Sequence, residues 1–221
     1  MMHQGTHNRM MAGARRVRPR GGRGAFTMIE IAIALAIIGF ALVAIVGILP
    51  AGLTVQRESR EKTIINGDAQ YFMEMIKQFQ RGPVAEPQSD LTNFVERVDT
   101  PNGSYSNFVF DWEIVGLLCT PGTNDAWVRA ITGTANDRRI DDEGFSFRYR
   151  LTVEVRPLFT ARLNHPDRDV LLTNAWDVRF VFQWPLLHNG NVGREEMVYP
   201  TLISGPIVND PPGNIYFYFE P

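Results

Sequence analysis

The sequence predicts an α+β protein in which a long N-terminal helix packs on an antiparallel β-sheet head. Three observations predict this fold: one long apolar run near the N-terminus, a second stretch with helical spacing of its apolar residues, and later segments that alternate apolar and polar residues. The 221 residues are 44% hydrophobic and 21% charged, which is the composition of a folded protein. This length fits one modest domain with an appendage.

A basic leader over residues 1–25 opens the chain. It holds six arginines and no acidic residue. Without these arginines, the remaining 16 basic and 24 acidic residues give residues 26–221 a formal net charge of -8. An acidic body is repelled by phosphate backbones, so no nucleic-acid partner is expected.

The apolar run predicts a membrane-spanning helix within residues 26–56. Ile31–Gln56 contains no charged residue, and the 19 residues of Ile31–Leu49 are almost all apolar. As a helix these 19 residues would reach about 28 Å, close to the thickness of the hydrocarbon layer. The basic flank and the lack of a comparable second apolar segment predict a single crossing, with the leader in the cytoplasm and the rest exported. A buried core helix is the alternative, and the arginine-rich flank disfavours it.

A cleaved secretory signal peptide is a further alternative, because it also has a basic front and an apolar middle. The run is longer than the roughly 7 to 15 apolar residues of such a peptide. Its small-x-small triplet, Ala32-Ile33-Ala34, lies inside the run, and the following Pro50-Ala51-Gly52-Leu53 is a poor cleavage site. Glu30 stands at the start of the run, where a carboxylate is costly in lipid and therefore usually functional.

The residues Arg23-Gly24-Ala25-Phe26-Thr27-Met28-Ile29-Glu30, followed by the apolar run, resemble the N-terminal signal of type IV prepilins and type II secretion pseudopilins. In that family a membrane-embedded prepilin peptidase removes a basic leader and methylates the new N-terminal amine, and a glutamate is the fifth mature residue. The resemblance therefore implies cleavage between Ala25 and Phe26, N-methylation of Phe26, and a role for Glu30 in subunit assembly.

The cleavage position has one alternative. The family most often has glycine directly before the cut, whereas here Gly24 stands one place further back and Ala25 intervenes. A cut after Gly24 would make Glu30 the sixth mature residue. We favour the cut after Ala25, because a small alanine fits the same narrow site and this choice keeps the family positions of Phe26 and Glu30. The start of translation is also open among four methionines (Met1, Met2, Met10, Met11).

The role that the resemblance implies for Glu30 has a physical basis. Burying either the Phe26 amine or the Glu30 carboxylate alone in an apolar bundle is costly, and pairing them removes much of the cost. In the family, the glutamate of one subunit meets the terminal amine of its neighbour. The alternative is that Glu30 lies in the headgroup layer of an ordinary signal anchor.

An amphipathic continuation of the helix is predicted over residues 57–82. Pro50 and Gly52 should kink or loosen the helix without ending it. Beyond them apolar residues recur at steps of three and four, and Gly82-Pro83 predicts an end near Arg81. The residues of this stripe are Ile65, Ala69, Phe72, Ile76 and Phe79.

The head is predicted over residues 83–221. Residues 83–107 are rich in proline and polar residues and are expected to form a connecting loop. Strict alternation predicts strands over Phe145–Val155 and Trp176–Trp184, with Asn189-Gly190 in a hairpin before Met197–Ser204. Further strand candidates are Phe108–Leu118, Ala126–Thr132 and Ile215–Phe219.

The head offers little chemistry. No GxSxG, HExxH, Walker or GxGxxG pattern occurs in context, so we expect no enzyme and no cofactor. His165 and His188 are isolated, and we interpret them as surface histidines. Cys119 cannot form an internal disulfide, and we interpret it as a small buried hydrophobe and not as a nucleophile.

Two features of the head leave alternatives open. An acidic loop could hold calcium, but it lacks the EF-hand spacing, so we favour a solvated loop and no metal site. Its residues are Asp137, Asp141, Asp142 and Glu143. The aromatic run Tyr216–Phe219 could contact a neighbouring subunit or form an edge strand buried within the head.

These expectations combine into one functional hypothesis, a filament subunit of a type IV pilus or a type II secretion pseudopilus. Its expected partners are the prepilin peptidase, other pilin or pseudopilin subunits and the lipid of the bacterial inner membrane. The lack of paired cysteines favours a minor or pseudopilin subunit over a disulfide-looped major pilin. Two alternatives remain: a signal-anchored exported binding protein that forms no filament, and an anchored hydrolase, for which no nucleophile and base are visible.

Overall fold

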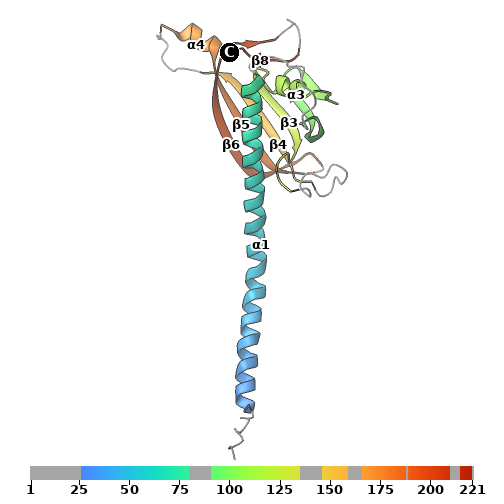
Figure 1. Cartoon of the computed structure of the whole chain (residues 1–221), viewed down its shortest axis with the longest axis vertical. Coiled ribbons are helices and arrows are strands. Elements are labelled where there is room, and N and C mark those ends of the chain that lie inside the picture. The colour runs from blue at the N-terminus through green and yellow to red at the C-terminus, as the bar shows by residue number, and fades with distance from the viewer. Residues whose placement is uncertain are drawn as a thin grey trace, which may run out of the picture. The chain divides into compact units, whose positions relative to one another are not determined.

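A computed structural model of the protein describes residues 26–79, 91–134, 146–158, 166–187, 189–209 and 215–220. The chain divides into two compact units, with the boundary between Gly52 and Leu53. Helix α1 (Met28–Gln78) runs through this boundary. Figure 1 colours the chain by residue number from blue to red, and the two units are described one at a time below.

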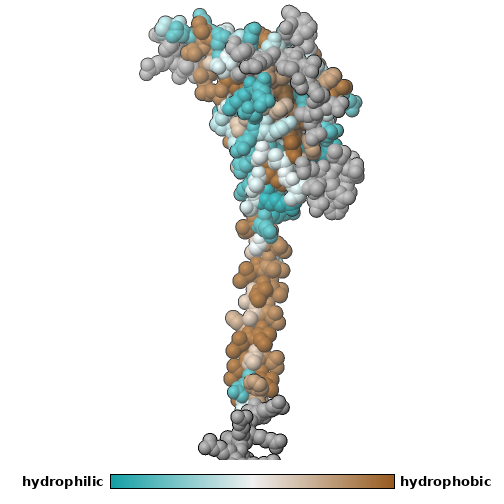
Figure 2. Space-filling model, viewed as in Figure 1, coloured by the Kyte–Doolittle hydropathy of each residue, from teal (hydrophilic) through white to brown (hydrophobic). Residues whose placement is uncertain are grey.

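The first unit consists, among the described residues, of the N-terminal part of α1. Its side chains are exposed along the whole length, large hydrophobic ones included, and apolar residues cover its surface in Figure 2. Pro50 lies inside α1, so it does not end the helix. Transfer of such an exposed apolar surface from water into an apolar environment is favourable. This is the one helix of the described chain that is long and apolar enough to span a membrane.

The second unit is built on a six-stranded sheet with the order β2-β1-β3-β4-β5-β6. Every pairing in it is antiparallel, as the alternating segments of the sequence predict. A small second sheet pairs β7 with β8. The strands are β1 (Val95–Thr100), β2 (Gly103–Ser106), β3 (Gly122–Arg129), β4 (Arg148–Pro157), β5 (Ala175–Leu186), β6 (Val192–Ser204), β7 (Ile207–Val208) and β8 (Tyr218–Phe219).

The core of this unit lies between the sheet and the C-terminal half of α1. The stripe predicted from the helical spacing is buried, and Phe72 packs its ring 6.5 Å from that of Phe182 on β5. On β4 and β5 every second side chain is buried. Fully burying one such aromatic or aliphatic side chain contributes about 1.5 to 3 kcal/mol. The α+β arrangement of a long helix on an antiparallel sheet is therefore confirmed.

The predicted strand over Phe108–Leu118 is wrong, because most of this segment forms helix α3 (Asp111–Leu118). Glu113 accepts hydrogen bonds through Oε2 from the N–H groups of Val109 (2.7 Å) and Phe110 (3.0 Å) and so caps the helix start. Ile114, Leu117 and Leu118 then share one buried side at helical spacing. Two further short helices are α2 (Leu91–Phe94) and α4 (Arg168–Asn174).

The predicted loop over residues 83–107 is wrong from residue 91 onward, where α2, β1 and β2 follow one another. The pairing of β1 with β3 shifts register between Val95 and Arg97. This bulge breaks the period of two, since Val95 and Val98 are three apart and both buried. The strand therefore had no alternating pattern in the sequence.

Several helix and strand boundaries differ from the predicted ones. α1 ends at Gln78, and Arg81 lies outside the described residues. β3 begins at Gly122, before the predicted strand, and ends at Arg129. Residues 130–134, predicted in part as strand, form a loop against α1.

Candidate functional site

The start of α1 is closed by a reciprocal pair of hydrogen bonds between Thr27 and Glu30. The Glu30 carboxylate accepts from the Thr27 N–H (2.8 Å) and from the Thr27 hydroxyl (2.8 Å), both through Oε2. In return the Thr27 Oγ1 accepts from the Glu30 N–H (3.3 Å). This is a capping box, which satisfies two backbone donors that a helix start leaves without intrahelical partners.

The site is open to its surroundings. Phe26 is 81% exposed and Met28 is 89% exposed. Glu30 is exposed as well, and it is the acidic residue of the first turn of α1, where a negative charge is favoured by the helix dipole. An exposed carboxylate at the head of an apolar helix can therefore be met by a cation from another molecule.

The structure describes part of the predicted processing site. Phe26 directly precedes the capping box, so the Glu30 carboxylate lies at the N–H of the residue next to Phe26. Gly24 and Ala25, the residues on the leader side of the predicted cut, lie outside the described residues.

The contribution of Thr27 was missing from the sequence interpretation. The signal that reveals it is the spacing Thr-x-x-Glu before an apolar run, which is the sequence pattern of a capping box. Thr27 fixes the orientation of the Glu30 carboxylate with two hydrogen bonds to one oxygen.

A second carboxylate, Asp68, is buried where α1 packs on the head. Its Oδ1 accepts from the Thr132 N–H (2.7 Å), and its Oδ2 accepts from the Ile131 N–H (3.0 Å) and the Tyr149 hydroxyl (2.8 Å). The Thr132 hydroxyl donates to the Ile64 carbonyl (3.1 Å). One side chain of α1 thus holds the loop after β3 and a residue of β4.

Burial is the main influence on the pKa values of Asp68 and its hydrogen-bond donor Tyr149. It raises the pKa of Asp68, although the hydrogen bonds from Thr132, Ile131 and Tyr149 each lower it. Burial also raises the pKa of Tyr149, and the Asp68 charge adds to this effect. Asp68 is fully buried and accepts three hydrogen bonds from the head, so its role is to hold these elements together.

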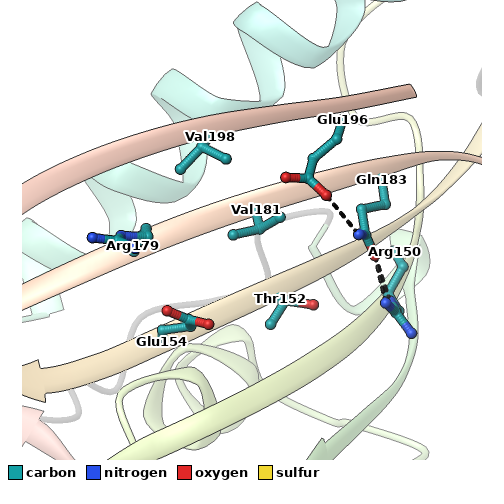
Figure 3. Close-up of a pocket in the computed structure, with 8 residues that line it drawn as sticks. All are labelled: Arg150, Thr152, Glu154, Arg179, Val181, Gln183, Glu196 and Val198. Atoms are coloured by element: carbon teal, nitrogen blue, oxygen red, sulfur yellow. Dashed lines mark hydrogen bonds between the residues drawn. The ribbon is translucent and has the colours of Figure 1, made fainter. Parts of the chain in front are cut away.

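The outer face of the sheet carries a shallow polar hollow over β4, β5 and β6 (Figure 3). A chain of hydrogen bonds crosses the three strands there: Arg150 Nε donates to Gln183 Oε1 (3.1 Å), and Gln183 Nε2 donates to Glu196 Oε2 (2.8 Å). Glu154 pairs with Arg156 at 3.1 Å. These polar groups bind one another, which is typical of the solvent face of a sheet.

The remaining candidates for chemistry are placed as follows. Cys119 is fully buried, and burial raises the pKa of its thiol, which disfavours the reactive thiolate. His165, His188 and the acidic loop of residues 137–143 lie outside the described residues. Across the part of the chain that the structure describes, no group of three or more His, Cys, Asp or Glu residues is placed to hold a metal ion.

Part of the aromatic run Tyr216–Phe219 packs within the head, and only its last two residues form a strand, β8. Phe219 is buried and contributes to the core, and the ring of Tyr216 lies 4.9 Å from that of Trp112 on α3. Tyr216 also packs against Gly116, where a Cβ atom would lie 2.8 Å from the Tyr216 Cβ. The run is thus part of the head itself.

Comparison of the chain with protein-family models, with curated proteins and with solved structures finds no match.

Proposed function

We propose that this chain is a pilin-like or pseudopilin subunit, which a prepilin peptidase processes and which assembles into a type IV pilus or type II secretion pseudopilus filament. One observation carries the proposal. The segment Phe26-Thr27-x-x-Glu30, which resembles the prepilin signal, forms the start of a helix whose apolar surface is exposed over its N-terminal part. The subunit acts by assembly, without catalysis and without a cofactor.

Processing prepares the N-terminus for this role. Hydrolysis of the bond between Ala25 and Phe26 releases the basic leader and leaves a cationic amine on Phe26, which the peptidase then methylates. Both Thr27 bonds go to Oε2 of Glu30, and no described residue donates to Oε1. This oxygen is the acceptor for the Phe26 amine of a neighbouring subunit.

The pairing fixes where neighbouring helices meet. An isolated charge in an apolar bundle is costly, whereas a paired one is much less so. Two neighbouring helices therefore pack with lowest free energy when the amine of one lies beside the Glu30 of the other. Their exposed apolar side chains leave the lipid for the contact between helices, as the filament forms.

The proposal also places the chain in the cell. Before assembly the subunit resides in the bacterial inner membrane as a single-pass protein, with its N-terminus in the cytoplasm and its head exported. The apolar part of α1 and the arginines that precede it support this orientation.

Replacement of Glu30 tests the assembly role. Glu30→Ala should leave the level of membrane-inserted, leader-free protein unchanged and reduce the amount recovered in sheared filaments by about tenfold or more, as expected for loss of a desolvated ion pair. Glu58→Ala, at an exposed glutamate of the same helix, is the matched control and should assemble normally.

Equal recovery of the Glu30→Ala variant and the control in filaments would contradict the proposal. If neither the unchanged protein nor the variants enter filaments while the head is exported, the chain is a signal-anchored exported binding protein instead.

A further inference from the structure

Strand β6 is one edge of the six-stranded sheet, and among the described residues no strand pairs with its outer side. It is also the longest strand of the described residues, at 13 residues. A long free edge is a template on which a strand of another molecule can pair. The side chains of Val198 (45% exposed) and Leu202 (64% exposed) also make this edge apolar. An apolar free edge is more prone to aggregation by strand pairing.

Pro200 lies between these two apolar residues, opposite Arg179 of β5 in a continuous antiparallel ladder. Proline has no N–H, so it fits such a ladder only where the N–H would point away from the partner strand. Its missing donor is therefore on the free edge. Because the pattern alternates, the N–H groups of Val198 and Leu202 point to the same edge.

The missing donor divides the free edge into two short parts. On one side of Pro200, near its start, the strand carries three consecutive charged residues, Arg194, Glu195 and Glu196, all exposed. On the other side it ends at Ser204. The opposite edge of the sheet is β2, which has only four residues. Both edges thus carry features that disfavour strand addition.

We propose that Pro200 closes the β6 edge to a second copy of this chain, so that two copies that meet do not join their sheets. This inference goes beyond the proposed function and does not depend on it. It predicts that any contact between heads forms without strand addition at β6.

The test restores the missing donor. Pro200→Thr supplies an N–H and a residue that favours strands, and Val198→Thr, in the same row, is the matched control that adds no donor. The full, uncleaved chain is purified in detergent micelles without a prepilin peptidase. Association is measured by sedimentation velocity, and backbone protection of residues 194–204 is measured by hydrogen exchange.

We expect Pro200→Thr to associate at about tenfold lower concentration than the unchanged protein, because each copy gains a backbone hydrogen bond. The amides of Val198, residue 200 and Leu202 should then exchange more slowly as the concentration rises. The control should behave as the unchanged protein does.

Hydrogen exchange separates this contact from association through α1, which would leave the β6 amides unprotected. Equal association and equal exchange in Pro200→Thr and the control would overturn the inference. So would concentration-dependent protection of the β6 edge in the unchanged protein. If Pro200→Thr loses its tryptophan fluorescence signature, Pro200→Ala restores the same donor with a smaller side chain and decides the question.

Discussion

At the scale of single residues, Asp68 and Glu30 show two ways of placing a carboxylate on one helix. Glu30 is exposed and binds only its own first turn, whereas Asp68 is buried and binds two backbone N–H groups and a tyrosine of the head. Glu30 is accessible to another molecule, whereas Asp68 stabilises the packing of α1 on the head. Burial and available donors, and not residue type, decide between these roles.

Asp68→Asn tests the buried site. The amide presents an N–H₂ group to donors, so we expect the free energy of unfolding to fall by roughly 1 to 3 kcal/mol. The measurement is denaturant unfolding of the full chain in micelles, followed by tryptophan fluorescence. All four tryptophans belong to the head, namely Trp112, Trp127, Trp176 and Trp184.

The same variant gives a pH signature. Because burial raises the folded-state pKa of Asp68 above its ordinary value of 3.8, its contribution is complete below that value and declines as the pH rises through the folded-state pKa. The difference in stability between the unchanged protein and Asp68→Asn should therefore be largest at low pH and shrink above it. Tyr149, the other titratable group at the site, stays protonated over this range because its pKa is also raised. A difference that grows with pH would contradict this account.

At the scale of elements, the sequence patterns predicted the parts that bury one full face. The helical stripe of α1 and the alternation of β4 and β5 are regular because each element packs one side against the core. Strand β1 was not predicted, because its bulge interrupts the alternation of buried and exposed residues. Helix α3 was predicted as a strand, because its apolar run is compatible with either element. In α3 the choice depends on Glu113, whose hydrogen bonds to Val109 and Phe110 start the helix.

Glu113→Ala tests that assignment. Loss of the two capping hydrogen bonds, together with the longer one from the Tyr216 hydroxyl (3.4 Å), should lower the free energy of unfolding by about 1 kcal/mol, the usual effect of losing a helix cap. Glu74→Ala, at an exposed position of α1, is the control, and both are compared by tryptophan fluorescence in denaturant. An unchanged stability in Glu113→Ala would mean that packing alone specifies α3.

At the scale of the whole molecule, the two units follow different rules. Residues 28–52 are helical with exposed apolar side chains, so the surroundings of this segment must supply the apolar partner. The second unit buries a core of its own, between the sheet and the C-terminal half of α1. The sequence predicted the candidate site at Glu30 because a charge at the start of an apolar run is conspicuous. It did not predict Asp68, since nothing local to the sequence shows which loop residues of the head will reach α1.

The central claim is that the leader is removed at Phe26, and N-terminal mass spectrometry of the membrane-bound protein tests it most directly. The chain is expressed with and without a prepilin peptidase that is shown to cleave a known substrate. We predict an N-methylated Phe26 that appears only with the peptidase. An intact leader despite the active peptidase would contradict the claim and favour a signal anchor, and a new terminus beyond Pro50 would mean a secreted protein.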